Sequence, residues 1–112
     1  MTATPAPLLR ALTERDGHRS AWTGRDVDTL VPQHRQGGMG GGDSKQRLSN
    51  LVWLESDING LIESDAAYAA EARRRGIKIS IHSNPEEIPL VHAVHGAWVV
   101  LGDDGSIRVA VD

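Results

Sequence analysis

The amino-acid sequence predicts an α+β domain, because it carries one strong helix signal and two strong strand signals. Residues 61–75 are rich in Ala, with acidic residues in their first turns and three Arg in their last, an order that favours an α-helix. Residues 49–54 form a short apolar run typical of a buried strand. Near the C-terminus, apolar runs flank the Asp-Asp-Gly-Ser turn at 103–106, which predicts a β-hairpin over about residues 97–111.

The N-terminal third of the chain carries weaker signals. Residues 8–14 place three Leu on one helical face and are followed by Asp16-Gly17, so we expect a short helix that ends there. Residues 26–35 hold several aliphatic residues interrupted by Pro32, a pattern that predicts a strand or a hairpin.

Glycines punctuate the middle of the chain. Residues 37–42 hold five Gly, but they lack the Gly-Lys-Ser/Thr ending of a phosphate-binding loop, so we interpret them as a flexible connector. Gly60 is expected to open the long helix and Gly76 to end it. Residues 77–81 then alternate Ile with polar residues, as strands do, before a turn at 84–85.

Length and composition indicate one small domain. The chain has 112 residues, and we expect a flexible tail over 1–7 and a single domain over 8–112. Because Phe is absent, the core must be built from Leu, Ile, Val and Ala with three Trp. No stretch approaches the roughly 18–20 apolar residues that cross a bilayer. The N-terminus has no basic region followed by an apolar run, so we expect no signal peptide and a cytoplasmic protein.

Cysteine and charge narrow the function classes. The absence of Cys excludes disulfides, thiolate catalysis and Cys-based zinc sites. The net charge is −3, and residues 51–112 hold ten of the fifteen acidic residues but five of the twelve basic ones. A DNA-binding protein normally shows a basic stripe, so the charge gives little support to DNA binding.

One ordered set of residues is more specific. His34 precedes the Gly-rich segment and Asn50 follows it, within the order strand, Gly-rich loop, strand, helix. This set resembles the ββα-metal core of HNH endonucleases, in particular the small HNH proteins of actinobacterial phages. The resemblance implies a core over about residues 27–76, with His34 as the general base and Asn50 tying the loop to the strand. Further similar segments are 15–19, 38–41, 60–64 and 96–106.

The chain departs from the family at the structural zinc site. Family members often hold zinc with two Cys-x-x-Cys pairs, because four thiolates at that spacing form a closed tetrahedral site. The resemblance places those four positions at Ser20, Thr23, Glu55 and Ile58. We therefore expect no structural zinc, and a fold held instead by packing around Trp22 and Trp53.

The metal ligands that the resemblance implies for catalysis are also changed. They fall on Gln33 and Asn59, and neutral amides bind Mg²⁺, Mn²⁺ or Zn²⁺ poorly compared with carboxylate or imidazole. Two interpretations stay open for Asn59 and Glu63, which are one helical turn apart. Together they could hold a weakly bound hard cation near His34, or Asn59 caps the helix and Glu63 complements its dipole.

Basic residues and histidines remain as candidate sites. The candidates for contact with nucleic acid are Arg35, Lys45, Arg47, Arg73, Arg74 and Arg75. The three consecutive Arg have a simpler interpretation, because cations stabilise a helix C-terminus. His82, His92 and His95 share no compact ligand spacing, and we expect ordinary, partly buried histidines there.

Three functions follow from these observations. A non-catalytic HNH-like binding module that engages a host or phage protein accounts best for the loss of both metal systems and for the acidic balance. It predicts no cofactor and no membrane contact. The alternative is a weak metal-dependent DNA endonuclease, with His34 as base and Asn59 and Glu63 as ligands of Mg²⁺ or Mn²⁺. The third is a non-catalytic DNA-binding domain that uses the basic residues.

Overall fold

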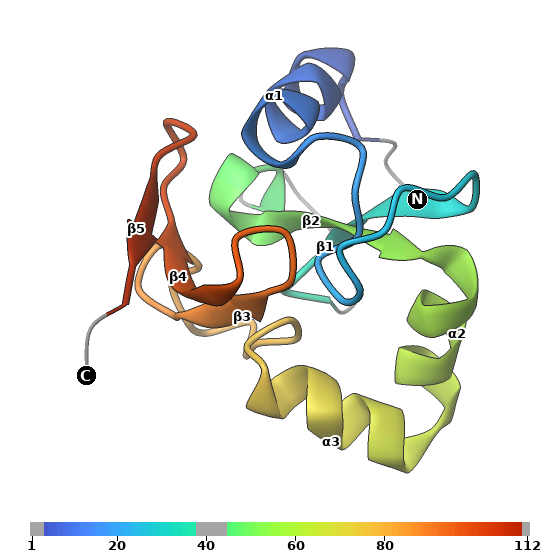
Figure 1. The fold of residues 1–112 in the computed structure, drawn as a ribbon. Coiled ribbons are helices and arrows are strands. Elements are labelled where there is room, and N and C mark those ends of the chain that lie inside the picture. The colour runs from blue at the N-terminus through green and yellow to red at the C-terminus, as the bar shows by residue number, and fades with distance from the viewer. Residues whose placement is uncertain (1–3, 38–44, 111–112) are drawn as a thin grey trace.

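The computed structural model describes residues 4–37 and 45–110. Its elements are α1 (Ala6–Asp16), β1 (Leu30–His34), the 3₁₀ helix η2 (Leu48–Asn50), β2 (Leu51–Glu55), α2 (Ser56–Ser64), α3 (Ala66–Arg74), β3 (Leu90–His92), β4 (Ala97–Leu101) and β5 (Ile107–Val109). The pair β1–β2 crosses the middle of the molecule, with α1 on one side and α2–α3 on the other (Figure 1). A second antiparallel sheet has the order β3-β4-β5. The predicted α+β class is confirmed.

Helix α1 begins inside the segment that was expected to be a tail. Pro7 lies in its first turn, where the missing N–H would have had no helical partner. The helix ends at Gly17, whose φ of 68° lies in the left-handed region that favours glycine. The helix predicted over residues 8–14 is therefore confirmed and extends further at both ends. Residues 1–3 lie outside the described part of the chain.

Strand β2 is buried along its whole length and supplies two cores. Successive side chains of a strand point to opposite faces. One face contributes to a cluster beside α1 that contains Leu12, Leu30, Leu48, Leu51 and Trp53. The other contributes to the main cluster of Ala21, Val52, Leu54, Ile62, Ala72, Ile77, Leu90, Val99 and Leu101. The apolar run predicted at 49–54 is thus confirmed as a strand, with its bounds moved to Leu51–Glu55.

Strand β1 pairs antiparallel with β2 and brings His34 opposite Leu51. Pro32 lies opposite Trp53, and a Pro is tolerated here because β1 is an edge strand. The strand predicted within residues 26–35 is confirmed over Leu30–His34. Residues 38–44, which hold most of the expected Gly-rich connector, lie outside the described residues.

The single helix predicted over residues 61–75 is wrong. Two helices occupy this region, and the first begins at Ser56, so that Gly60 lies inside it rather than opening it. The break falls at Asp65, which has extended backbone angles (φ −120°, ψ 125°). Its side chain accepts hydrogen bonds from the N–H groups of Ala67 and Tyr68, so Asp65 is the N-cap of α3. The expectation that Gly76 follows the last helix is confirmed, with a φ of 73°.

The alternating segment at 77–81 is not a strand. It makes one bridge, between Ile79 and Gln36, while Ile77 is buried and Ile81 is 58% exposed. Strand β3, which had no clear sequence signal, pairs with β4 instead.

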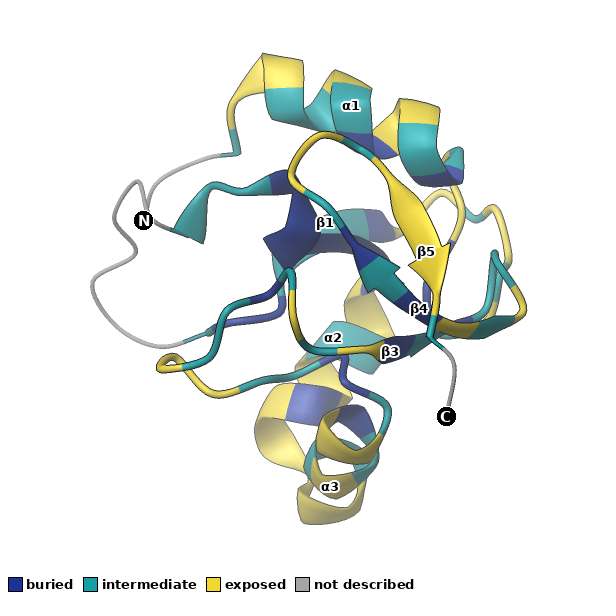
Figure 2. Ribbon diagram, turned by 90° about the vertical axis from the view of Figure 1, so that its left-hand side faces the viewer, coloured by how far each residue is buried: buried dark blue, intermediate teal, exposed yellow. Residues whose placement is uncertain are grey.

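The predicted C-terminal hairpin is confirmed as β4 and β5. Val99 and Leu101 point into the main cluster, whereas every residue of β5 is exposed (Figure 2). Residue 111, the end of the predicted hairpin, lies outside the described residues.

Arg35 follows β1 directly and is fully buried. Its guanidinium donates hydrogen bonds to four backbone carbonyls, those of Ser49, Gly76, Pro85 and Ile88. Burial, with a smaller contribution from the charge of Arg15, lowers the pKa of Arg35 to about 10, so the side chain remains a cation at neutral pH. It ties β1 to residues 76–88, which contain no helix or strand.

We predict that Arg35→Met strongly destabilises the protein. Met keeps much of the side-chain volume but removes every donor, which leaves four carbonyls, three of them in buried hydrogen bonds, without this partner. The free energy of unfolding, measured by urea denaturation, should fall by about 3 kcal/mol or more. The matched control Arg73→Met, at an exposed position of α3, should change it by less than about 0.5 kcal/mol. A loss below about 1 kcal/mol for Arg35→Met would contradict the role given to this contact.

Candidate functional site

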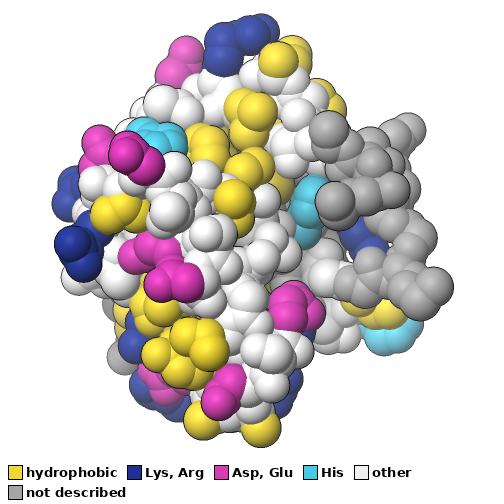
Figure 3. All heavy atoms as spheres, turned by 90° about the vertical axis from the view of Figure 1, so that its right-hand side faces the viewer, with side chains coloured by type: hydrophobic (Ala, Val, Ile, Leu, Met, Phe, Trp, Pro, Cys, Tyr) yellow, Lys and Arg dark blue, Asp and Glu magenta, His cyan; other side chains and the backbone are white. Residues whose placement is uncertain are grey.

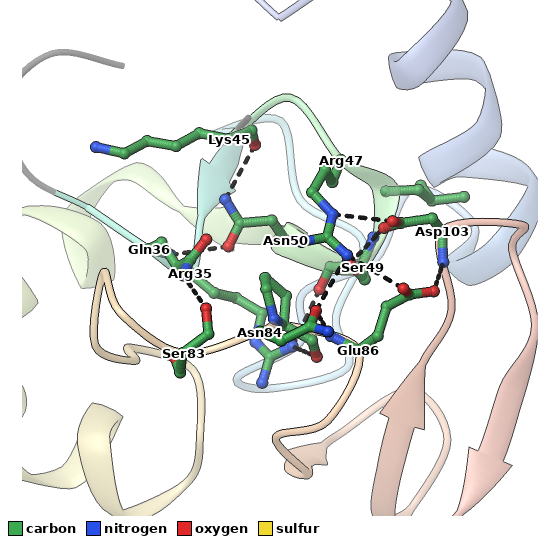
Figure 4. A network of polar contacts seen from close by, with 12 residues as sticks. Arg35, Gln36, Lys45, Arg47, Ser49, Asn50, Ser83, Asn84, Glu86 and Asp103 are labelled. Atoms are coloured by element: carbon green, nitrogen blue, oxygen red, sulfur yellow. Dashed lines mark hydrogen bonds and ion pairs between the residues drawn. The ribbon is translucent and has the colours of Figure 1, made fainter. Parts of the chain in front are cut away.

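Asn50 ties together the two ends of the segment between Gln36 and Lys45. Its Oδ1 accepts from the N–H of Gln36 at 2.9 Å, and its Nδ2 donates to the carbonyl of Lys45 at 3.0 Å (Figure 4). Its own carbonyl accepts from the N–H of Arg35 at 2.7 Å. The side chain is fully buried, so these contacts fix the end of β1 against the start of β2.

His34 lies at the end of β1 and lines a small cleft. The structure brings several of the predicted site residues to this cleft, whose polar lining includes Gln33, His34, Asn59, Glu63 and Lys78. Asn59 and Glu63 come from α2, and Lys78 follows α3. His34, Asn59 and Glu63, predicted from separate parts of the sequence, therefore share one site.

The polar groups of this cleft form a poor set of ligands for a metal ion. Glu63 is the one carboxylate among the described residues that line it, and its Oε2 lies 4.0 Å from the ammonium of Lys78. His34 Nε2 lies 3.0 Å from Oε1 of Gln46. Gln33 and Asn59 offer neutral amides. Hard divalent cations favour several oxygen ligands including carboxylates, and the described lining offers one carboxylate with the cation of Lys78 nearby. Sequence analysis missed Lys78, because only the fold brings it beside α2.

Three of the four positions that correspond to zinc ligands in the resemblance also come together. The hydroxyl of Ser20 donates to Oε1 of Glu55, and the hydroxyl of Thr23 donates to Oε2 of Glu55 at 2.6 Å. Burial acts to raise the pKa of Glu55, but these hydrogen bonds outweigh it and lower the pKa below its usual value. The fourth position, Ile58, packs against the main cluster instead.

The expectation that packing of Trp22 and Trp53 replaces the zinc site is therefore incomplete. Trp53 belongs to the cluster beside α1, and Trp22 stacks with Tyr68. The direct link between the loop at 20–24 and β2 is polar, since an ionised carboxylate accepts from two hydroxyls. We call this group of three residues, Ser20, Thr23 and Glu55, the carboxylate pin.

We predict that the protein needs no structural zinc, because the carboxylate pin has no thiolate. Its melting temperature should be the same with and without excess chelator, as measured by circular dichroism. Glu55→Gln should lower the free energy of unfolding by about 1–3 kcal/mol, because the amide cannot accept from both hydroxyls. Glu87→Gln, at an exposed position outside the pin, is the matched control and should have little effect. Stoichiometric zinc in the purified protein, or unfolding by chelator, would count against this prediction.

The basic residues predicted to contact nucleic acid are mostly engaged elsewhere. Arg35 is buried, so its charge does not reach the surface. Arg47 forms ion pairs with Asp103 and Glu86 at 2.9 and 3.1 Å (Figure 4). Lys45 donates to the carbonyl of Gly37 at 3.2 Å.

The remaining three candidates lie at the end of α3. Arg74 and Arg75 both form ion pairs with Glu71, whereas Arg73 is exposed. On the described part of the face in Figure 3, Lys and Arg form separate spots among Asp and Glu rather than a continuous band. The cationic track that a DNA backbone requires is therefore weak on this face.

A buried polar cluster that sequence analysis missed lies between α1 and β3. Asp16 ends α1, and its two carboxylate oxygens accept from Arg15, with His92 Nε2 at 3.1 Å and His95 Nε2 at 2.8 Å. Asp16 and His92 are buried. Burial opposes ionisation of Asp16, but the hydrogen bonds from Arg15 and His92 prevail and hold its pKa well below its usual range. The expectation of an ordinary, partly buried histidine is wrong for His92, which is fully buried, and no pattern in the sequence indicated its partner Asp16, 76 residues away.

The side chains of Asp16, His92 and His95 are joined by hydrogen bonds. Their ligand atoms lie within 4.8 Å of one another, as ligands of one cation would. However, Arg15 already occupies both oxygens of Asp16. Nδ1 of His92 accepts from the N–H of Val94, so the neutral ring carries its proton on Nε2 and donates it to Asp16. The cluster is satisfied as a hydrogen-bonded network that ties α1 to β3.

We predict that stability falls as the pH is lowered from 7 to 5. Burial lowers the pKa of His92, and the charges of His95 and Arg15 add to this, while Asp16 opposes it. Below about pH 6.5, His92 therefore binds a proton in the unfolded state while it stays neutral in the native state. The free energy of unfolding then falls by up to about 1.4 kcal/mol for each unit by which the pH is lowered. Asp16, whose pKa is lowered, contributes stability that is lost only at more acidic pH.

Urea denaturation at several pH values tests this prediction. His92→Gln keeps a donor toward Asp16 but does not titrate, so its slope of unfolding free energy against pH should be smaller. His82→Gln, at an exposed histidine, should leave the slope unchanged. Equal slopes for wild type and His92→Gln would show that His92 is not the group responsible.

Comparison of the chain with protein-family models, curated proteins and solved structures found no match. Among the described residues, no helix is long and apolar enough to span a membrane. Function must therefore be argued from the residues and geometry of this chain.

Proposed function

We propose that this protein is an HNH-like pseudo-nuclease that works by binding a protein partner and does not cut DNA. The observation that carries the proposal is the pairing of Glu63 with Lys78 in the cleft of His34. HNH chemistry needs a divalent cation to stabilise charge on the scissile phosphate. Here a lysine ammonium faces the cleft's carboxylate, and Gln33 and Asn59 are neutral. The resemblance implies that His34 is the base, and the side chains around it are poor ligands for the metal that this chemistry needs.

Two features support an HNH-like core. Asn50 binds the backbone at both ends of the Gly-rich segment, which is the role that the resemblance implies for it. In addition, Ser20, Thr23 and Glu55 meet in space, as the positions of a shared zinc site would. Three of the four positions that the resemblance implies to be neighbours are therefore in contact, whereas Ile58 packs against the main cluster.

Charge pairing favours a protein partner over DNA. Arg47, Arg74 and Arg75 each face a carboxylate, and Arg35 is buried. Non-specific DNA affinity depends mainly on neutralising phosphates, and a net charge of −3 opposes it. A surface of paired charges is compatible with binding a folded protein or a peptide.

A weak metal-dependent endonuclease remains the second candidate, because His34, Asn59 and Glu63 line one cleft. In that case Mg²⁺ or Mn²⁺ would bind Asn59 and Glu63 after Lys78 moved aside, and His34 would activate water.

We predict that supercoiled plasmid DNA stays intact at micromolar protein with Mg²⁺, Mn²⁺, Ni²⁺ or Zn²⁺. Gel electrophoresis of wild type, His34→Ala and His82→Ala in parallel gives the measurement. Metal-dependent cleavage that His34→Ala abolishes and the matched His82→Ala variant retains would establish the nuclease and overturn the proposal. Cleavage that survives His34→Ala would belong to a contaminant, since the implied base is gone, and would leave the proposal standing.

A further inference from the structure

A second, more open pocket lies between the loop at 20–24 and α3. Its lining residues are Trp22, Ala67, Tyr68, Glu71 and Arg75. The rings of Trp22 and Tyr68 are stacked, with centroids 6.1 Å apart and planes inclined by 21°. The guanidinium of Arg75 lies 4.1 Å from the centre of the Trp22 ring, a cation–π contact. None of these residues belongs to the His34 cleft.

The side chains of this pocket are held in place before any partner arrives. The carboxylate pin fixes the loop that carries Trp22, because Ser20 and Thr23 both donate to Glu55. Arg75 Nε donates to Glu71 at 2.6 Å, one helical turn away. Trp, Tyr and Arg are the residue types that dominate binding energy in protein interfaces. Rigid anchors of this kind bind with a smaller loss of conformational entropy.

The charge around the pocket indicates an acidic occupant. Arg74 and Arg75 both pair with the single carboxylate of Glu71, so this group of three side chains carries a net charge of +1. Hydrogen bonds from Arg74 and Arg75 lower the pKa of Glu71 to about 2, so it stays ionised and this local charge holds at neutral pH. The Nη atoms of Arg75 make no hydrogen bond to the described residues, which leaves them available to a carboxylate of a partner.

We propose that this pocket docks an acidic segment of a protein partner, an inference that rests on the proposed binding function. An apolar side chain of the segment lies over Ala67 and Tyr68, where a small residue leaves room, and a carboxylate binds Arg75. Ala67 and Arg75 are eight residues apart on one helix, about 12 Å along its axis. An extended chain covers that distance in about three to four residues. The segment therefore has an apolar residue and an acidic residue at that spacing.

A peptide is favoured over single-stranded nucleic acid, which also stacks on aromatic rings and binds Arg. Phosphates recur at every nucleotide and need cations along their whole path. At the other end of α3, its exposed N-cap Asp65 is acidic, so the basic path ends within this helix. A peptide that places one or two carboxylates at Arg75 keeps its negative charge away from the acidic end of the helix.

The test uses an array of twelve-residue peptides. Each peptide carries one Trp, Leu or Met and a run of Asp and Glu, and the number of residues between them varies across the array. A matched array replaces the acidic residues with Lys and Arg, and labelled oligothymidylate is the nucleic-acid probe. Full-length protein should bind acidic peptides with the three-to-four-residue spacing, more weakly at high salt, and should not bind the basic array. Tighter binding of oligothymidylate or of basic peptides would overturn the proposal, and so would binding of acidic peptides that does not depend on the spacing.

Two neighbouring alanines provide matched variants. Ala67→Glu puts a carboxylate into the pocket, whereas Ala66→Glu makes the same change at an exposed position of the same helical turn that does not line it. Ala67→Glu should weaken binding at least tenfold and Ala66→Glu less than twofold. Arg75→Gln, which removes the cation, should also weaken it tenfold, and circular dichroism verifies that each variant is folded. Equal effects of the two Glu variants would overturn the pocket assignment.

The peptide-binding test and the nuclease test can fail independently of each other. Metal-dependent nuclease activity overturns the pseudo-nuclease proposal whatever the peptides do. Failure of the acidic peptides, with plasmid DNA intact, overturns this pocket alone and directs the search for the partner's site to another surface.

Discussion

The buried guanidinium of Arg35 is the contact on which the C-terminal half of the fold depends. A cation without a carboxylate is costly to bury, and here backbone carbonyls supply the compensating partial charge. Residues 76–88 lack helix and strand, so their carbonyls have few partners within regular structure. A side chain with five donors therefore determines the path of the chain there. Because His34 directly precedes Arg35, the hydrogen bonds of Arg35 also help to hold His34 in position in the cleft.

The magnitudes show how much the carboxylate pin contributes to stability in comparison with a structural zinc ion. Structural zinc contributes roughly 10–16 kcal/mol to folding in small zinc-binding peptides. A hydrogen bond to a charged group contributes about 1.5–3 kcal/mol, so the two hydroxyls on Glu55 replace a fraction of that. The remainder must come from burial, and β2 supplies it by facing two apolar clusters at once. A loop held by the carboxylate pin therefore depends on a strand that is apolar on both faces.

Local signals in the sequence predicted what local interactions decide. The buried strand, the C-terminal hairpin and the glycine after α3 depend on neighbours within a few residues. The break at Asp65 was missed because an acidic residue is equally typical of a first helical turn and of an N-cap. The contact between Asp16 and His92 joins residues 76 apart, and no periodicity reports it. Arg35 was assigned to nucleic acid because a sequence does not distinguish an arginine that binds carbonyls from one that binds phosphate.

Two polar contacts that support the candidate sites lie at opposite ends of one strand. Asn50, just before β2, organises the segment beside His34, and Glu55, the last residue of β2, fixes the loop that carries Trp22. Five residues of strand separate these ends by about 17 Å, and both faces are buried, so each end is held rigidly by the same core. Polar contacts therefore anchor both ends of this strand, at Asn50 on one side and at Glu55 on the other. One strand that is apolar on both faces thus supports the segment beside His34 and the loop that carries Trp22.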